Sequence, residues 1–240
     1  ETAFGTYHPP HPVFRVLATQ AYYGRRKERF RDELIAALRM LEEGHVTLAE
    51  FKSSWAGAFG LTQFMPTDFY KFAVDLDGDG KRDLFHSVPD ALGSAAAQLK
   101  GYGWEADKPW GFETVTPKGA DCSLEGLANV RPMRAWLALG YTRTDGKPVP
   151  PALLDVETML LMPAGMHGPS FLTTRNFQVI KAYNFADLYA LFVGHLSDRI
   201  AGKGPFLGTW ETVTPMLERD AMEMQEHLRT AGFEIEKIDG

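Results

Sequence analysis

Three short segments of the sequence hold residue types that can perform chemistry together. Glu1 opens the first segment, Gln63 lies in the second and Asn184 closes the third, and the segments span residues 1–5, 57–66 and 182–184. A carboxyl group can donate and accept a proton during a reaction, and a side-chain amide can donate and accept hydrogen bonds. The combination predicts a site with one acid and two amides that bind a polar ligand.

The order of these segments resembles the lytic transglycosylases, in which a glutamate heads the first segment, a Gly-x-x-Gln turn forms the second and an Ala-Tyr-Asn triplet closes the cleft. The closer resemblance is to the membrane-bound lytic transglycosylase B family, and it covers nearly the whole chain to about residue 201. Each matching fragment is short enough to occur by chance, so the argument depends on the ordered set. The fragments are residues 54–60, 63–66, 70–75, 175–177 and 183–184.

The resemblance implies an enzyme that cleaves the MurNAc-GlcNAc bond of peptidoglycan without water. Glu1 would protonate the oxygen of the departing sugar, and would then accept the proton of the muramic acid C6 hydroxyl as it attacks C1, which leaves a 1,6-anhydromuramoyl end. Glycosidases usually employ a second carboxylate. The three segments hold no other acidic residue, which favours assistance by the N-acetyl group of the sugar itself.

An acid that must be protonated at working pH needs a raised pKa, and an apolar pocket provides one. Phe4, Phe64 and Met65 are the expected walls of that pocket around Glu1. Without the other segments, Glu1 would be interpreted as an exposed terminal glutamate, as most carboxylates are exposed.

The predicted substrate-binding residues allow two interpretations each. By resemblance, Ser54 orients the acid, the amides of Gln63 and Asn184 bind the N-acetyl group or the glycan, and Tyr183 stacks on a sugar. Alternatively Ser54 caps a turn, the two amides satisfy loop backbone and Tyr183 belongs to the core. The full predicted set is Ser54, Gln63, Phe64, Met65, Tyr183 and Asn184.

A calcium-loop pattern occupies residues 75–83, with oxygen ligands at the first, third, fifth and ninth positions and glycine at the sixth. The twelfth position holds His86, although this pattern expects a bidentate acid there, and histidine is a poor ligand for a hard cation. By resemblance, the loop would bind a structural Ca²⁺, as it does in family members that have it. A metal-free Asx-type turn is the alternative interpretation, and both stay open. No other cofactor is expected. The candidate ligands are Asp75, Asp77, Asp79, Lys81 and Asp83.

The apolar periodicity predicts a mainly α protein of the α+β class, with a lysozyme-like helical core and a small α/β insertion. A capping box at residues 47–50 predicts a further short helix. Strands are expected at residues 110–115 and 156–162. Helices are expected at residues 14–23, 30–41, 89–102, 131–139, 176–182, 187–201 and 217–230.

These elements suggest a catalytic core that is discontinuous in sequence. We expect its first part at residues 1–103, the insertion at 104–172, the closing helices at 173–206 and a linker at 207–216. Residues 217–240 resemble the opening of a small three-helix peptidoglycan-binding domain, here truncated; a simple amphipathic helix is the alternative. That second resemblance is carried by Gln225, Leu228, Gly232, Phe233, Asp239 and Gly240.

The composition excludes several classes of function. The 240 residues are 45% hydrophobic and 23% charged, which is typical of a folded globular protein. The net charge of −6 argues against nucleic acid as a partner. Cys122 is the only cysteine, so no internal disulfide can form.

The expected partner is the glycan strands of peptidoglycan, with peripheral association to the cell wall or outer membrane. The resemblance places the protein in the periplasm or cell envelope of a Gram-negative bacterium. No signal peptide is visible, and because Glu1 already belongs to the motif, we expect the numbering to start inside the gene product. Two rival functions stay open: a hydrolytic lysozyme, and a non-catalytic wall-binding or scaffold protein.

Overall fold

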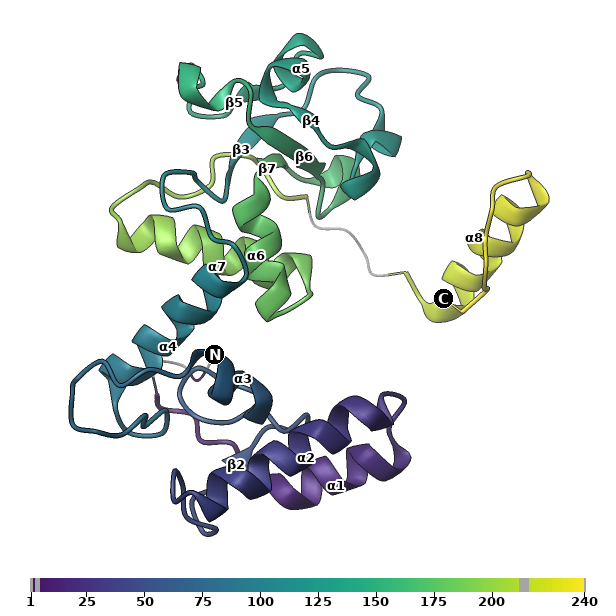
Figure 1. Cartoon of the computed structure of the whole chain (residues 1–240). Coiled ribbons are helices and arrows are strands. Elements are labelled where there is room, and N and C mark those ends of the chain that lie inside the picture. The colour runs from purple at the N-terminus through teal and green to yellow at the C-terminus, as the bar shows by residue number, and fades with distance from the viewer. Residues whose placement is uncertain (1, 3–4, 212–215, 240) are drawn as a thin grey trace. The chain divides into compact units, whose positions relative to one another are not determined.

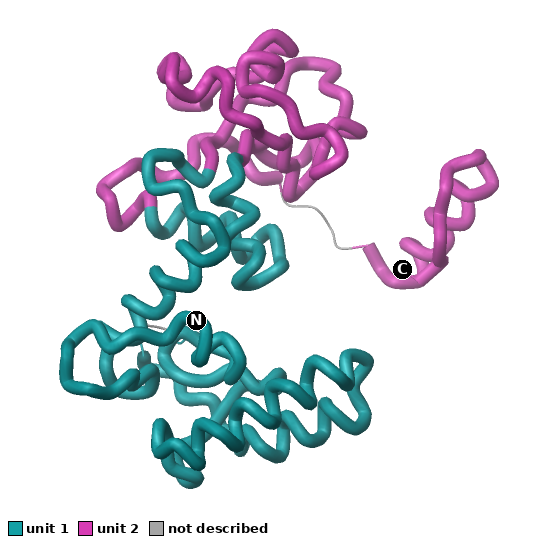
Figure 2. The backbone as a smooth tube through the Cα atoms, in the orientation of Figure 1, with its two compact units in different colours: residues 1–110, 174–197 teal, residues 111–173, 198–240 magenta. Residues whose placement is uncertain are grey.

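The computed structural model describes residues 2, 5–211 and 216–239. The chain forms two compact units, which Figure 2 distinguishes by colour. The first unit combines residues 1–110 with residues 174–197, and the second combines residues 111–173 with residues 198–240. Within the described residues, no helix is long and apolar enough to span a bilayer.

The first unit is helical. Its helices α1 and α2 pack side by side (Figure 1), and β1 pairs with β2 in an antiparallel ladder in which His11 lies opposite Ser53. The strands are β1 His11–Pro12 and β2 Lys52–Ser53. The helices are α1 Val13–Tyr23, α2 Lys27–Glu42, α3 Pro66–Phe72, α4 Val88–Gly101, α6 Arg175–Tyr183 and the start of α7 Asp187–Ile200.

Aromatic rings fill the core of the first unit. Phe51 and Phe59 meet edge to face with ring centroids 5.2 Å apart, and the side chains of Phe64 and Phe69 are equally buried. Each such side chain contributes roughly 2 kcal/mol when it leaves water. Since Phe59 and Phe64 lie within the predicted second segment, this core fixes both ends of the loop between them.

The capping box at Thr47 does not begin a helix, so that prediction is wrong. Residues 48–50 form one turn, in which the carbonyl of Thr47 accepts from the amides of Glu50 and Phe51 at 3.2 and 3.0 Å. Helical continuation ends there because Phe51 enters the core and β2 pairs with β1. Tertiary burial thus overrides a correct local start signal.

The second unit is built on a five-stranded sheet of order β4-β6-β7-β3-β5, whose neighbouring strands are all antiparallel. All four residues of the central strand β7 are buried. The strands are β3 Gly111–Val115, β4 Arg131–Pro132, β5 Thr142–Arg143, β6 Glu157–Leu161 and β7 Ser170–Thr173. The helix α5 Met133–Ala138 and the short 3-10 turns η1 Cys122–Leu124, η2 Leu127–Asn129, η3 Pro151–Leu153 and η4 Gly165–His167 connect them.

Glu113 on β3 holds the segment that leaves the sheet. Its carboxylate accepts hydrogen bonds from the amides of Leu207 and Gly208, both at 2.8 Å, and from the Thr144 hydroxyl at 2.9 Å. Beyond this anchor lies α8 Glu218–Thr230, in which no side chain is buried. The first residues of the predicted 207–216 linker are therefore fixed to the sheet.

Candidate active site

The loop at residues 59–65 carries Gln63, Phe64 and Met65 of the predicted site. Phe59 and Phe64 close it with two reciprocal backbone hydrogen bonds of 2.9 Å. Among the described residues, Gln63 is the one non-glycine residue with positive φ, +54°. This left-handed conformation costs about 1–2 kcal/mol for an L residue. Strain of this kind persists only where the surroundings fix it, and it is concentrated at functional sites.

Gln63 also bonds back to its own loop. Its side-chain Nε2 donates to the carbonyl of Gly60 at 2.9 Å, and its backbone amide donates to the same oxygen at 3.3 Å. The contact corresponds to the alternative in which the amide satisfies loop backbone. Whether Gln63 also contacts a ligand remains a prediction.

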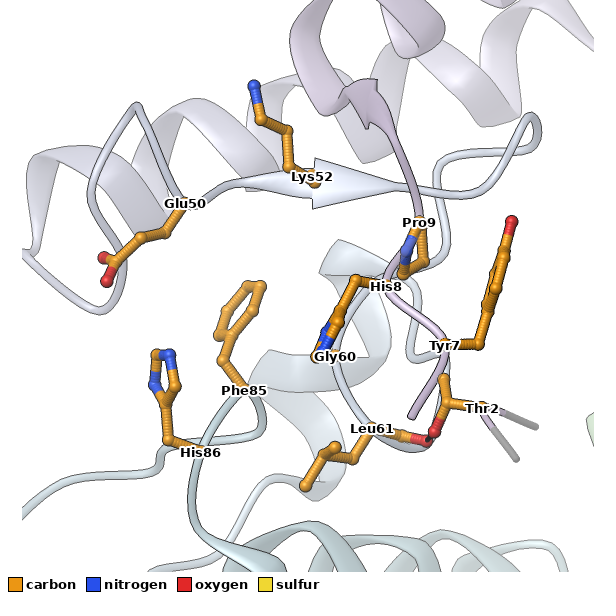
Figure 3. Close-up of a pocket in the computed structure, with 10 residues that line it drawn as sticks. All are labelled: Thr2, Tyr7, His8, Pro9, Glu50, Lys52, Gly60, Leu61, Phe85 and His86. Carbon is orange, nitrogen blue, oxygen red and sulfur yellow. Dashed lines mark hydrogen bonds between the residues drawn. The ribbon is translucent and has the colours of Figure 1, made fainter. Parts of the chain in front are cut away.

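The first motif segment meets this loop through Thr2. The buried Thr2 hydroxyl donates to the carbonyl of Leu61 at 2.7 Å, and the carbonyl of Thr2 accepts from the amide of Tyr7 at 3.0 Å (Figure 3). Glu1, the predicted acid, and Phe4, one of its predicted walls, lie outside the described residues. The neighbour of Glu1 is nevertheless placed directly on the loop that carries Gln63.

The third segment meets the same loop through Tyr183. The Tyr183 hydroxyl donates to the carbonyl of Thr62, and its ring stands edge-on to Phe64 with centroids 6.4 Å apart. Asn184 ends α6 as an exposed residue, and its side-chain oxygen accepts from the amide of Ala186 at 3.3 Å. Tyr183 thus joins the loop directly, whereas the observed side-chain contact of Asn184 is with its own downstream backbone.

Ser54 acts as a turn cap. Its hydroxyl oxygen accepts from the amides of Ala56 and Ala58 at 3.3 and 3.2 Å. The turn continues through Gly57, whose φ is +90°, and a Cβ there would lie 2.3 Å from the side chain of Leu17. Glycine is therefore required at position 57 for conformation and for space.

Phe64 and Met65 differ in exposure. Phe64 is 1% exposed and belongs to the core, whereas Met65 is half-buried and occupies the N-cap position of α3. Phe64 anchors the loop to the core through its buried ring and its backbone bonds with Phe59. Its predicted role as a wall around the acid stays untested.

Sequence reasoning missed Glu33, a buried carboxylate on α2. It is 3% exposed, and it accepts hydrogen bonds from the amide and from the hydroxyl of Thr67, both at 2.8 Å. Burial raises the pKa of Glu33, although the bonds from Thr67 partly counteract it. One signal was present in the sequence: Glu33 shares a helix face with Ala37 and Met40, both fully buried.

A cavity of about 190 Å³ lies beside the contact between Thr2 and Leu61. Figure 3 shows the residues around it, which come from the N-terminal segment, from the turn and strand after α2, from the 59–65 loop and from the segment before α4. Its lining joins apolar walls to ionisable groups. The residues are Thr2, Tyr7, His8, Pro9, Glu50, Lys52, Gly60, Leu61, Phe85 and His86.

The calcium-loop residues form a second polar cluster. Carboxylate oxygens of Asp75, Asp77 and Asp90 all lie within 4.8 Å of one another. Oxygen donors gathered in this way suit a hard cation such as Ca²⁺. His86 turns away to Asp83, with 3.1 Å between Nδ1 and Oδ2. The cluster therefore fits a cation through Asp90 in place of the residue at the twelfth position.

Hydrogen bonds within the loop already organise these carboxylates. Asp75 accepts from the amides of Gly78 and Gly80 at 2.6 and 2.8 Å. Asp90, which is 0% exposed, accepts from the amides of Leu76 and Asp83 at 2.8 and 2.9 Å. Burial alone would raise the pKa of Asp90, but these backbone donors together hold it below its ordinary value.

Two predicted ligands serve the loop backbone. Asp79 accepts from the amide of Lys81 at 2.8 Å, and Asp83 accepts from the amides of Phe85 and His86 at 2.8 and 3.0 Å. The three described carboxylates that converge therefore share only Asp75 and Asp77 with the predicted set.

Comparison with known proteins decides the family. The family model described as Transglycosylase SLT domain matches residues 1–198. The chain belongs to that family. The predicted resemblance to the lytic transglycosylase B family is confirmed: the chain is 30% identical over 204 residues to membrane-bound lytic murein transglycosylase B of Escherichia coli K12, an alignment that covers 84% of this chain and 54% of the relative.

Solved structures of this family agree with the fold. SltB3 from Pseudomonas aeruginosa, in complex with NAG-NAM-pentapeptide, matches with a TM-score of 0.92 and 42% identity over 100% of this chain and 64% of SltB3. Slt35 from Escherichia coli, in complex with calcium, matches with a TM-score of 0.71 and 28% identity over 84% of this chain and 62% of Slt35. The predicted α+β class with a lysozyme-like core is confirmed. The chain spans about half the length of the transglycosylase B relative and less than two thirds of these two structures.

Proposed function

We propose that this chain carries the catalytic domain of a lytic transglycosylase that cleaves the MurNAc-GlcNAc bond of peptidoglycan and leaves 1,6-anhydromuramoyl ends. Membership of the family supports the proposal, as do the names of its relatives. The observation that carries it is the convergence on one loop: Thr2 donates to the carbonyl of Leu61, and Tyr183 donates to the carbonyl of Thr62. Three segments far apart in sequence thereby meet around Gln63.

In the proposed reaction one carboxyl group acts twice. Glu1 gives its proton to the glycosidic oxygen as the bond from that oxygen to C1 of muramic acid breaks. The N-acetyl group of the sugar stabilises the positive charge that develops at C1. The C6 hydroxyl then attacks C1 and returns its proton to the carboxylate of Glu1, so the acid is regenerated without water.

The amides would hold the glycan during these steps. Gln63 sits in a loop whose backbone is fixed by partners on both sides, so its side chain is pre-organised. Asn184 would offer its amide from the end of α6, and the half-buried ring of Tyr183 supports the loop between them. These roles follow the family pattern of the three segments.

A structural Ca²⁺ is part of the proposal. Asp75, Asp77 and Asp90 would hold it, together with groups of the predicted set, and the ion would offset the repulsion among the three neighbouring carboxylates. It would order the loop before α4 and take no part in bond cleavage.

We further propose that the protein acts on the wall of a Gram-negative bacterium, in the periplasm. The names of the relatives support this location, since one is a membrane-bound murein transglycosylase of Escherichia coli. The segment around α8 would be the start of a wall-binding module, as its sequence pattern suggests.

Mass spectrometry of the products from purified sacculi tests the function. Anhydro ends are expected from the wild-type chain, and replacement of the acid by Glu1→Gln should lower their release by about a thousandfold or more, since no second carboxylate replaces it. Reducing ends would instead identify a hydrolytic lysozyme. Binding to sacculi without any product would identify a wall-binding protein.

A further inference from the structure

We propose that Glu33 is a positioning residue for the 59–65 loop, and through it for Gln63, in the reaction proposed above, on which this inference rests. Glu33 lies on α2, outside all three motif segments. Both oxygens of its buried carboxylate accept hydrogen bonds from Thr67: Oε2 accepts from the backbone amide and Oε1 accepts from the hydroxyl.

Thr67 matters because it stands at the start of α3, directly after the loop. The N-cap residue Met65 makes no side-chain capping bond, and Pro66 has no amide hydrogen to donate. The amides of Asp68 and Phe69 already donate to the carbonyl of Met65 at 3.0 and 3.1 Å. The amide of Thr67 is thus the first helical donor without a partner inside the helix, and Glu33 supplies that partner from another helix.

The loop is consequently held on three sides. Thr2 and Tyr183 bond to its carbonyls, and Glu33 fixes the point where the chain leaves it. Gln63 keeps its left-handed backbone only while these contacts prevent relaxation. Since Glu33 is the carboxylate among these partners, it is the contact whose strength changes with protonation.

Charged and titratable groups on α2 and α3, and one at the end of α4, interact electrostatically with Glu33. Arg29 on its own helix α2 lowers the pKa of Glu33, and Asp68 on α3 raises it further beyond the effect of burial. Tyr102, at the end of α4, lies in the same electrostatic cluster, and burial raises its pKa as well. Burial also raises the pKa of Asp68, which Lys71 partly offsets.

The sign of the pH effect follows from these directions. Because the pKa of Glu33 is raised, it takes up a proton as pH falls before an ordinary glutamate would. Protonation removes the charge that strengthens both bonds to Thr67, so the loop loosens at acid pH. The free energy of unfolding changes in the opposite direction. An acid whose pKa is raised in the folded state stabilises the fold less as pH rises through that pKa. Loop order and global stability should therefore change in opposite directions with pH.

The test uses the whole chain and the isosteric variant Glu33→Gln, which is a permanent mimic of the protonated state. At neutral pH its kcat for anhydro-product release should fall about tenfold with KM nearly unchanged. This is the loss expected when hydrogen bonds to a charged carboxylate are replaced by hydrogen bonds to a neutral amide. Its activity should also lack the acid limb of the wild-type profile. Asp32→Asn, an equal charge change at an exposed neighbouring position of α2, is the matched control and should follow the wild type.

Hydrogen exchange of residues 60–68 provides a second measurement that needs no turnover. The protection factors of these amides, which correct for the pH dependence of the intrinsic exchange rate, should be lower in Glu33→Gln at neutral pH and in the wild type at acid pH. A Glu33→Gln variant with the wild-type acid limb and wild-type exchange would overturn the proposal.

Should Glu33→Gln not fold, Thr67→Val carries the test, because it removes only the hydroxyl bond. We expect the same changes at about a third of the size, with recovery in Thr67→Ser; an unchanged loop in Thr67→Val overturns the proposal. A wild-type chain without anhydro products refutes the proposed function, and the exchange measurement still decides the role of Glu33 in holding the loop.

Discussion

Removal of one carboxylate from the Asp75, Asp77 and Asp90 cluster should change stability in opposite directions with and without calcium. The oxygens lie within 4.8 Å of one another, a distance at which two charges repel by about 1 kcal/mol even in bulk water. Asp77→Asn removes two of the three carboxylate–carboxylate repulsions, so it should stabilise the metal-free protein by about 1–2 kcal/mol. For a chain of this length that raises Tm by roughly 2–8 °C.

In calcium, the wild type should become more stable than Asp77→Asn. An ion present at a hundred times its Kd stabilises the wild type by about 2.7 kcal/mol, or roughly 5–10 °C in Tm. Asp77→Asn should lose most of this gain, so that its Tm exceeds that of the wild type in chelator and falls below it in calcium. Thermal unfolding in chelator and in millimolar calcium measures both arms.

Two controls separate this cluster from general charge effects. Asp107→Asn removes an exposed carboxylate elsewhere in the first unit and should leave the calcium shift intact. Asp79→Asn removes a predicted ligand outside the converging cluster and should reduce the shift less than Asp77→Asn does. The reasoning is refuted if millimolar calcium leaves the wild-type Tm unchanged, or if Asp77→Asn is the less stable protein in chelator.

Two further perturbations test contacts of the site and of the second unit. Tyr183→Phe removes the hydroxyl that donates to Thr62 and should cost about 1 kcal/mol, or roughly 2–4 °C in Tm, together with a loss of kcat; the exposed Tyr22→Phe is the control, and equal Tm values for the two would contradict the assignment. Glu113→Ala leaves the amides of Leu207 and Gly208 without their acceptor and should cost about 2–4 kcal/mol. Proteolysis within residues 205–211 should then be faster than in the exposed control Glu157→Ala, and an unchanged cleavage rate would show that the segment is held by other contacts.

The sequence predicted most of the helical framework because its apolar residues repeat at the helical interval. The helices expected at residues 14–23, 89–102 and 187–201 correspond to α1, α4 and α7. The three motif segments were identified in order, and the first and third are seen to contact the second through Thr2 and Tyr183. Local patterns sufficed here, since each motif is a contiguous stretch.

The sequence did not reveal the carboxylates that act across elements. Asp90 lies in the first turn of α4, beyond the twelve-residue loop pattern, and it enters the cluster only because α4 packs its buried face toward that loop. Glu33 on α2 accepts a hydrogen bond from Thr67 on another helix, α3. In both cases the signal was a charged residue on the apolar face of a helix, and such a signal says that a partner exists without saying where the partner lies.

The chemistry proposed for the site places a particular demand on the 59–65 loop. A single carboxyl that must be protonated first and ionised later works best where no fixed countercharge holds it in one state. The groups seen to donate to the carbonyls of residues 60–62 are two hydroxyls and the amide groups of Gln63, all of them uncharged. The charged member of this arrangement, Glu33, is buried behind the start of α3 and acts on the loop through Thr67. The loop is thus held by uncharged donors, and a carboxyl that is not fixed in one ionisation state by a countercharge can serve as acid and then as base.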